Sequence, residues 1–317
     1  MKQMCVKAPI NIALIKYWGK KDELNVLPYN PSISLSLSLY ETHTVLEQCA
    51  SPGLTFTLND LADAKSEKKV REFLTFFPFD ETKEGLIIRS YNSGPTAAGL
   101  ASSASAFAAL ALACNLYYDE PYSFEGLASI TKKGSGSAIR SLLGGCVEWD
   151  TDGRIHALDW PFEDVVMGIV VLASQPKKTG STEGMKHTVQ TAPSYHDWVK
   201  QSHQDAKAFK RALQDKDFTQ LGSISEANAL ALHAVCADAK PPIHYLNEQS
   251  NALIKGIQEA RKEGLFEVYC TMDAGPNVKL LHRDKDTTRL TQWLNEHGWP
   301  EVRLSRIATK GAHRCER

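Results

Sequence analysis

The chain has 317 residues, of which 43% are hydrophobic and 23% are charged, so it can bury one large core or two modest ones. Its 36 basic and 37 acidic residues give a net charge of −1, which argues against a partner that is a nucleic acid or an anionic membrane. The sequence has no signal-peptide core and no run of 18 apolar residues, so we expect a cytoplasmic protein without a membrane span.

The first half of the chain alternates short strands with helices. Runs rich in β-branched and apolar residues predict strands over 42–47, 54–58, 85–90, 146–149 and 165–172. Apolar residues at helical spacing predict a helix over 67–77, and an Ala/Leu-rich run predicts another over 103–117, which a helix over 124–132 follows. The strand at 165–172 is apolar throughout, which is typical of a strand buried on both faces.

The second half begins with helices and ends with strands. The predicted helices are 195–214, 218–235, 249–264 and 287–298, and the predicted strands are 266–272 and 277–281. Gly264 is the expected C-terminal cap of the third of these helices. The mixture predicts an α+β fold with a division near residues 172–182, and we divide the chain into domains at 1–178 and 179–317.

The seven cysteines are scattered along the chain, and no two of them have the Cys-x-x-Cys spacing. An odd, dispersed set is typical of reduced thiols in a cytosolic protein, and we expect neither disulfides nor zinc. The ten histidines are also dispersed, without metal-ligand spacing.

Residues 93–105 (SGPTAAGLASSAS) lie between a predicted strand and an Ala-rich helix. Small residues let the backbone approach a ligand, and the helix that follows offers free N–H groups, so the segment predicts a polyphosphate-binding loop. The alternative is a tight turn with Ser102 or Ser103 as helix N-cap. It is not a Walker loop, because the Gly-Lys-Ser/Thr ending is absent.

Two further segments carry chemistry. Residues 132–141 (KKGSGSAIRS) contain Arg140, which can clamp a phosphate or carboxylate in bidentate fashion; the alternative is a flexible loop with a solvated arginine. Residues 269–277 (YCTMDAGPN) place Asp273 at the end of an apolar strand, where a carboxylate can orient or deprotonate a hydroxyl; the alternative is an Asp that starts a turn.

Residues 11–21 (NIALIKYWGKK) combine three lysines with a Tyr-Trp pair beside a glycine, very near the N-terminus. This composition suits an anionic ligand. The alternative is an amphipathic edge segment with solvated lysines.

In this order along the chain, NIALIKYWGK, PTAAGLASSAS, GSGSAIRS and TMDAGPN resemble the signatures of the mevalonate diphosphate decarboxylases of the GHMP kinase superfamily. Weaker matches, EANAL at 226–230 and GMKHT at 184–188, fill the gaps, so the resemblance runs from Cys5 to about Gly311. Several motifs in the right order are far more specific than one.

The resemblance implies a fold and a reaction. The fold is an N-terminal ribosomal-S5-like α/β domain and a C-terminal ferredoxin-like domain, with the site in the cleft between them. ATP, with Mg²⁺ bridging its phosphates, phosphorylates the 3-hydroxyl of 5-diphosphomevalonate. Loss of that phosphate then drives release of the carboxylate as CO2, giving isopentenyl diphosphate. The family also implies a homodimer.

The resemblance further implies residue roles. Asp273 matches the catalytic aspartate near the 3-hydroxyl, and Arg140 matches the arginine held to the substrate carboxylate. The positions implied to bind the substrate are Tyr17, Lys20, Ser137, Ser181 and Thr182. The positions implied to bind ATP are Ser90, Asn92, Ala98, Gly99, Ser102, Ser103, Ser105 and Ser135.

One departure concerns the substrate. The family usually has Ser-Ser-Arg ahead of the Gly-Met pair, and its arginine grips the diphosphate, whereas residues 180–185 here read GSTEGM, with Thr182 in the arginine position. Each hydrogen bond lost to a charged group costs about 1.5–3 kcal/mol. The nearby lysines, Lys177, Lys178 and Lys186, lack a planar fork. An alternative substrate is therefore 5-phosphomevalonate, giving isopentenyl phosphate.

Smaller departures are Gly94 in place of a bulkier residue, Ala106 in place of glycine, and Ile139 in place of a small residue. We expect Gly94 to loosen the entrance of the nucleotide loop and Ile139 to add bulk beside Arg140. Two other functions are weighed: a mevalonate kinase-like protein that does not decarboxylate, and a non-catalytic metabolite sensor. Asp273 and Arg140 argue against both.

Overall fold

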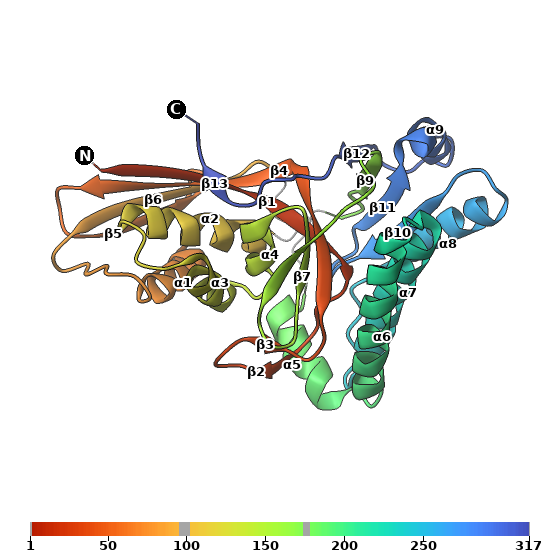
Figure 1. Cartoon of the computed structure of the whole chain (residues 1–317), viewed down its shortest axis with the longest axis horizontal. Helices are drawn as coiled ribbons and strands as arrows, with labels where there is room; N and C mark the ends of the chain where they lie inside the picture. Colours follow the sequence, from red (N-terminus) through yellow and green to blue (C-terminus); the bar gives the residue numbers. More distant parts are fainter. Residues whose placement is uncertain (1, 95–101, 174–177, 317) are drawn as a thin grey trace.

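The computed structural model describes residues 2–94, 102–173 and 178–316, with the side chain of Ser102 left out. Two β-sheets lie side by side along the long axis, each covered by helices (Figure 1). This arrangement confirms the α+β prediction.

The first sheet has seven strands in the order β13-β1-β4-β6-β5, and β7 pairs with β4 and β8. Its strands are β1 (Gln3–Ile15), β4 (Ser32–Cys49), β5 (Gly53–Leu58), β6 (Gly85–Asn92), β7 (Cys146–Trp149), β8 (Ile155–Leu158) and β13 (His313–Arg314). β5 and β6 are parallel, and the other pairs are antiparallel.

β1 and β4 form the long spine of this sheet, with a register that runs from Gln3 opposite Glu47 to Ile15 opposite Ile33. Only the first part of β1 alternates between exposed and buried residues; from Ala8 onward every residue is buried. The continuous burial arises because helices of the first half cover one face and the second half of the chain covers the other. From Ala8 onward β1 is therefore buried on both faces, unlike the amphipathic segment considered from the sequence.

Four helices cover one face of the first sheet (Figure 1): α1 (Ala64–Leu74), α2 (Ser102–Tyr117), α3 (Phe124–Gly134) and α4 (Ala138–Leu143). α2 is apolar nearly all round, and its small residues Ala108, Ala109 and Ala111 are fully buried in the core. Small side chains let α2 lie close to β1, which brings the start of the helix to the middle of the molecule.

The second sheet has four antiparallel strands in the order β10-β11-β9-β12. The strands are β9 (Val165–Val170), β10 (Val268–Met272), β11 (Val278–Arg283) and β12 (Val302–Ser305). The helices of this half are α5 (Ser181–Thr191), α6 (Tyr195–Gln214), α7 (Phe218–Asp238), α8 (Glu248–Lys262) and α9 (Thr287–Glu296), with a short 3₁₀ turn at Asp284–Asp286. A small hairpin, β2 (Lys20–Asp22) and β3 (Leu27–Pro28), follows β1.

Two strands lie in the opposite half of the structure from the one expected from the division proposed at residue 178. β9 precedes it in sequence but lies in the second sheet, and β13 follows it but pairs with β1. Between β12 and β13 the chain runs back over the first half: Ala308 N–H donates to Ser36 O (2.8 Å) and Ala312 N–H donates to Ser141 O (3.0 Å). We call residues 306–316 the C-terminal strap.

The strap ends in a disulfide between Cys5 and Cys315, so the prediction of reduced thiols is wrong for this pair. The sequence hides the pairing because 310 positions separate the two residues, whereas Cys315 N–H donates to Cys5 O at the edge of β1 (2.9 Å). The five cysteines at 49, 114, 146, 236 and 270 are free thiols.

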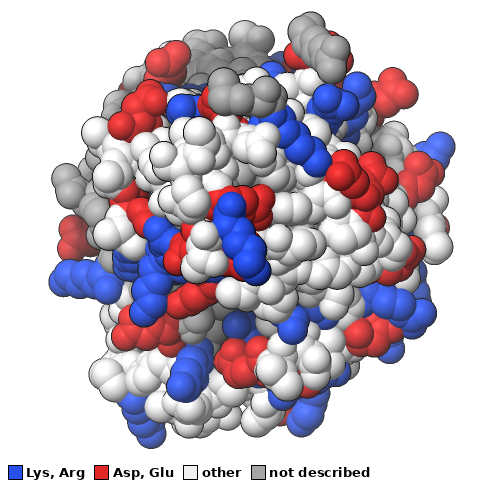
Figure 2. Space-filling model, turned by 90° about the vertical axis from the view of Figure 1, so that its left-hand side faces the viewer, with Lys and Arg blue, Asp and Glu red and all other residues white. Residues whose placement is uncertain are grey.

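Along the described ranges, no helix combines the length and apolar character needed to cross a membrane. On the face shown in Figure 2, basic and acidic side chains alternate, with no broad area of one sign. That pattern agrees with the net charge of −1 and gives no footprint for a polyanion on this face.

Candidate functional site

A carboxylate between two buried lysines lies where the two sheets meet. Asp273 directly follows β10, Lys16 directly follows β1, and Lys279 belongs to β11. Lys16 Nζ lies 2.9 Å from Asp273 Oδ1, and Lys279 Nζ lies 3.0 Å from Asp273 Oδ2. The lysine side chains are 2% and 1% exposed and the aspartate 24%, so the carboxylate is the part of this cluster that a ligand can reach.

The electrostatics of this cluster favour the ionised aspartate. Burial by itself raises the pKa of Asp273, but the charges of Lys16 and Lys279 hold it well below its usual range. Burial lowers the pKa of Lys16 to about 8, against the opposing effect of Asp273. The lysine is thus charged at neutral pH and close to losing its proton just above it.

The backbone around Lys16 is fixed by two buried asparagines. Lys16 N–H donates to Asn228 Oδ1 (2.8 Å), and Lys16 O accepts from Asn30 Nδ2 (2.6 Å). Asn30 Nδ2 also donates to Ser202 Oγ (2.8 Å), and Lys16 Nζ donates to Ala13 O (2.7 Å). These bonds join β1 to α6 and α7, so both halves of the chain set the position of Lys16.

Arg140 is a third cation in the same region. Its side chain is buried in α4, where Nε donates to Asn11 Oδ1 (3.3 Å) and Nη1 donates to Ser32 Oγ (2.7 Å). Burial lowers the pKa of Arg140 to about 10, and the nearby Asp273 charge opposes that shift. Three cations around one carboxylate leave a positive excess, which suits an anionic substrate.

The segment after Lys16 turns sharply beside this cluster. Tyr17 Oη is buried, has no hydrogen-bond partner among the described residues, and faces Gly136. Gly19 has φ +102°, and a Cβ there would lie 2.0 Å from Tyr195 Oη, which itself donates to Trp18 O (2.7 Å). Only glycine fits this position, which turns the chain from Tyr17 into β2.

Lys20 forms an ion pair within the β2–β3 hairpin and not with Asp273. Its Nζ lies 3.0 Å from Glu23 Oε2 within the β2–β3 hairpin, and its side chain is 18% exposed. Burial raises the pKa of Tyr17, and the Glu23 charge adds to that shift, so the Lys20–Glu23 pair and Tyr17 lie in the same neighbourhood.

A row of serine hydroxyls joins the two Gly/Ser-rich segments. Ser103 Oγ, in the first turn of α2, lies 3.5 Å from Ser135 Oγ, which lies 3.5 Å from Ser137 Oγ at the N-cap of α4. Ser137 O also accepts from Asn11 Nδ2 (3.2 Å), beside Arg140. The structure therefore brings Ser103, Ser135, Ser137 and Arg140 close together.

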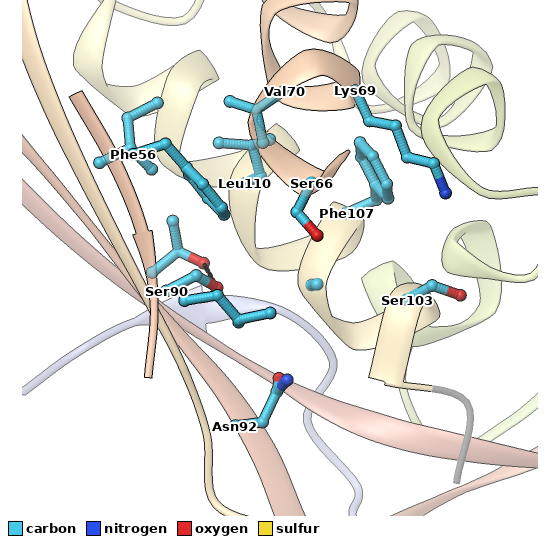
Figure 3. A pocket seen from close by; sticks show the side chains of 13 residues that line it. Phe56, Ser66, Lys69, Val70, Ser90, Asn92, Ser103, Phe107 and Leu110 are labelled. Atoms are coloured by element: carbon cyan, nitrogen blue, oxygen red, sulfur yellow. Dashed lines mark hydrogen bonds between the residues drawn. The ribbon is translucent and has the colours of Figure 1, made fainter. Parts of the chain in front are cut away.

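Next to Ser103 lies a cavity of about 150 Å³ between α1, α2 and the sheet (Figure 3). Its polar groups are Thr44 from β4, Ser66 and Lys69 from α1, Ser90 and Asn92 from β6, and Ser103. Its apolar walls include Phe56, Leu58, Val70, Ile88, Phe107 and Leu110. Apolar walls with a few polar groups at one side suit a planar heteroaromatic base.

Ser105 lies one turn into α2 with no exposed surface, and its hydroxyl is 2.7 Å from Thr42 Oγ1. Thr42 Oγ1 also donates to Asn92 Oδ1 (2.7 Å), and Ser90 Oγ lies 3.3 Å from Thr44 Oγ1. These bonds fasten α2 and β6 to β4, so Ser105 supports the predicted nucleotide loop from beneath. Ala98 and Gly99 lie outside the described residues, as does the side chain of Ser102.

The departure at residues 180–185 lies at the start of α5. Ser181 is half-buried, Thr182 is exposed, and the Gly180 N-cap has no side-chain hydrogen bond, which leaves the first-turn N–H groups without a side-chain cap. A Cβ on Gly184 would lie 2.0 Å from Tyr245 Oη and 3.4 Å from the Trp18 ring, so α5 packs tightly beside the segment that follows Lys16.

The other departures have structural explanations. A Cβ on Gly94 would lie 2.8 Å from the ring of Tyr40, so that ring fills the space that a larger side chain would take. Ile139 is 1% exposed and belongs to the hydrophobic core of the first half. Its bulk therefore packs into the core.

Sequence reasoning missed several residues of this site: Lys279, Asn11, Asn30, Asn228, Ser66 and Lys69. Lys279 had a usable signal, since a lone lysine inside the apolar strand 277–281 requires a buried partner. The asparagines had none, because each has a partner in a segment far away in the sequence.

Comparisons with known proteins cover nearly the whole chain. Residues 8–157 match the diphosphomevalonate decarboxylase-like N-terminal domain, and residues 167–315 match the mevalonate 5-diphosphate decarboxylase C-terminal domain. Diphosphomevalonate decarboxylase from Candida albicans is 36% identical, covering 94% of this chain and 91% of that protein.

Solved structures agree with these matches. Mevalonate diphosphate decarboxylase from Staphylococcus aureus is 37% identical with a TM-score of 0.89, covering 99% of this chain and 98% of that one. The protein MDDEF, in complex with MVAPP, AMPPCP and magnesium, is 36% identical with a TM-score of 0.89, covering 99% of both chains.

Proposed function

Because this chain belongs to the diphosphomevalonate decarboxylase family, we propose that it catalyses the ATP-dependent decarboxylation of 5-diphosphomevalonate to isopentenyl diphosphate. The observation that carries the proposal is the carboxylate of Asp273 held between Lys16 and Lys279, within electrostatic range of Arg140. The full-length similarity to MDDEF, whose structure contains MVAPP, AMPPCP and magnesium, supports the same substrates here.

Asp273 orients the 3-hydroxyl of the substrate for attack on the γ-phosphoryl group. Its pKa is held well below the usual range, so it is ionised at neutral pH but is a weak base. It therefore acts mainly as a fixed hydrogen-bond acceptor for the hydroxyl. Lys16 and Lys279 keep the carboxylate in place and add positive charge where phosphate charge gathers.

Arg140 holds the substrate carboxylate. Its contacts with Asn11 and Ser32 fix the guanidinium, so little freedom is lost when it binds a second group. After phosphate leaves carbon 3, the electrons of the breaking C–C bond neutralise the cationic centre and CO2 departs. A carboxylate fixed in position keeps that bond aligned with the leaving group.

The nucleotide lies along the start of α2. The cavity beside Phe107 takes the adenine base, and the hydroxyls of Ser103 and Ser135, with the α2 N-terminus, take the phosphates. Ser90 and Asn92 line the same cavity, and Ser105 holds the helix to the sheet. We extend the phosphate site to Ala98, Gly99 and Ser102 on the family resemblance.

Magnesium supports this reaction by neutralising phosphate charge as the phosphoryl group moves. Within residues 2–94, 102–173 and 178–316, no three His, Cys, Asp or Glu side chains lie close enough together to hold a metal ion. The polyphosphate itself therefore supplies most of the ligands, in keeping with the usual preference of Mg²⁺ for phosphate and water.

The 5-phosphate tail of the substrate lies toward Tyr17, Lys20 and Ser137 and the start of α5, where Ser181 and Thr182 lie. The uncapped N–H groups of α5 are suited to an anion. Thr182 is the one observation that favours the monophosphate as an alternative substrate, because threonine cannot form the bidentate contact of an arginine. We further propose a cytoplasmic homodimer with domains at 1–178 and 179–317, apart from β9, which belongs to the second sheet, and β13, which belongs to the first.

The test is steady-state release of ADP and CO2 by the purified protein with Mg²⁺ and ATP, on 5-diphosphomevalonate and on 5-phosphomevalonate. We expect equal amounts of ADP and CO2, and a higher kcat/KM for the diphosphate. ADP without CO2 would indicate a kinase, and a higher kcat/KM for the monophosphate would indicate the alternative substrate. No turnover of either substrate would overturn the proposed function. A preparation of the Asp273→Asn variant controls for contaminating activity.

A further inference from the structure

The turn between β1 and β2 is held through its backbone carbonyls. We call residues 17–20 the tail turn, because the 5-phosphate tail of the substrate is assigned to it. Trp18 O accepts from Tyr195 Oη (2.7 Å), and Gly19 O accepts from the Tyr29 N–H (3.3 Å). Buried carbonyls need such partners, so these two bonds fix the backbone of the tail turn.

The Tyr195 side chain fits closely against the tail turn. It has no exposed surface, and its ring packs edge-on against Tyr29 with the ring centroids 5.5 Å apart. A Cβ on Gly19 would lie 2.0 Å from Tyr195 Oη and 3.0 Å from its Cζ. Burial raises the pKa of Tyr195, so the hydroxyl keeps its proton at neutral pH and remains a donor.

Tyr195 also joins the two segments assigned to the phosphate tail. It is the first residue of α6, and its N–H donates to Ala192 O (3.1 Å) at the C-cap of α5. On α5, Val189 Cγ2 would lie 2.8 Å from the same Cβ on Gly19. The helix that begins at Ser181 and the tail turn therefore meet at Tyr195.

We propose that Tyr195 is a positioning residue that holds the tail turn, and with it Tyr17 and Lys20, in place for the 5-diphosphate of the substrate. Without the hydroxyl, Trp18 O would lose its buried donor, and the turn would shift. This inference rests on the proposed function, because it deepens substrate recognition by the same site. The residues that line the nucleotide cavity come from β4, β5, β6, α1 and α2, so ATP binding should be little affected.

The first experiment is Tyr195→Phe, which keeps the ring and removes only Oη. We expect the KM for 5-diphosphomevalonate to rise about 3- to 10-fold, with the KM for ATP within about twofold of wild type. A purely structural role would reduce the amount of folded enzyme and lower kcat without changing either KM. That outcome, or an unchanged KM for 5-diphosphomevalonate in the folded variant, would overturn the proposal.

Tyr122→Phe is the matched control. The Tyr122 hydroxyl also donates to a backbone carbonyl, that of Phe76 just after α1, far along the chain from the tail turn. The variant should leave the KM for 5-diphosphomevalonate unchanged, whatever it does to the melting temperature. An equal rise of this KM in Tyr122→Phe and Tyr195→Phe would overturn a specific role for Tyr195.

Gly19→Ala tests the same contact from the other side, and it keeps the inference testable if Tyr195→Phe fails to fold. The added methyl group collides with Tyr195 Oη, so the KM for 5-diphosphomevalonate should rise at least about threefold while the KM for ATP stays within about twofold. An unchanged KM for 5-diphosphomevalonate would overturn the proposal.

The double variant measures the coupling between the two residues. In Tyr195→Phe the hydroxyl that the methyl group displaces is absent, so the combined rise in KM should be smaller than the product of the single effects. Effects that simply multiply would overturn the proposed contact. Absence of ADP and CO2 release by the unaltered enzyme would refute the proposed function, and this inference with it.

Discussion

Asp273 Oδ1 and Lys16 Nζ lie 2.9 Å apart although 257 positions separate the two residues in the chain. Asp273 directly follows β10 and Lys16 directly follows β1, so the ion pair joins the two sheets. This pair of the site can therefore form only when the two halves of the chain pack against each other.

Asp273→Asn should abolish most activity. The amide still fits, but it carries no charge to hold the hydroxyl or to balance Lys16 and Lys279, so we expect kcat to fall about 10²- to 10⁴-fold. Removing one partner of a buried pair also costs about 3–5 kcal/mol of unfolding free energy, which urea denaturation would measure. The control is Asp164→Asn, which breaks a half-exposed pair with Arg283 and should leave kcat unchanged. A kcat within tenfold of wild type in Asp273→Asn would contradict the assignment.

Activity should depend on the charge of Lys16. Its pKa is about 8, so the ammonium loses its proton as the pH rises through that value, and Asp273 loses one of its two cations. We expect kcat/KM to decline above about pH 8, as measured over pH 6 to 10 in buffers of constant ionic strength. Lys16→Arg keeps its charge at these pH values, so the decline should move upward whatever the absolute rate. A decline at the same pH in both proteins would assign it to another group.

Arg140→Lys should lower kcat about 10- to 100-fold. A lysine reaches only one of Asn11 and Ser32 at a time and cannot form a two-point contact with a carboxylate. The measurement is CO2 release at saturating ATP, together with a thermal melt to show that the variant is folded. Arg154→Lys, in an exposed pair with Asp152, is the control and should match wild type. Near-normal CO2 release by Arg140→Lys would remove Arg140 from the substrate site.

Filling the cavity beside α2 should weaken binding of the nucleotide but not of the mevalonate substrate. Ala106 lines the cavity, and a phenylalanine there would occupy the space we assign to adenine. We expect the KM for ATP in Ala106→Phe to rise at least about tenfold, with little change in the KM for the mevalonate substrate. Ala252→Phe, on the exposed face of α8, controls for the added ring. Equal changes in both KM values would place the nucleotide elsewhere.

The Cys5–Cys315 disulfide should be detectable in the number of titratable thiols and in the free energy of unfolding. Of the seven cysteines, five are free, so titration of the denatured, unreduced protein should give five thiols, and seven after reduction. Cys315→Ser should lower the unfolding free energy by about 2–5 kcal/mol, because the cross-link closes almost the whole chain. A reductant should lower the melting temperature of wild type to that of the variant. Seven thiols before reduction would contradict the disulfide.

The sequence predicted long helices well, whether the apolar residues follow one face, as in α6, or surround the helix, as in α2. It predicted only residues 42–47 of β4, although serine alternates with isoleucine and leucine in the earlier part, which is a strand pattern. α5 was missed because GSTEGMK reads as a loop, and its helical form depends on packing of Gly184 against Trp18 and Tyr245.

The residues of the candidate site also differ in whether the sequence alone could propose them. Asp273, Arg140 and the serines lie in short motifs, so the sequence alone could propose them. Lys279 could not be assigned to the site in that way, because its place beside Asp273 depends on the pairing of β11 with β10. For Lys20 the motif suggests a contact with the ligand, whereas in the structure its ammonium group is paired with Glu23.

The C-terminal strap brings the two ends of the chain together, with the Cα atoms of Cys5 and Cys315 only 5.4 Å apart. A short peptide could therefore join the ends, and new ends could be opened at Lys216, in the exposed turn between α6 and α7. Such a circular permutant would keep every contact of the strap while starting the chain in the middle of the second half. The order in which the two halves leave the ribosome would then be changed without altering the folded enzyme.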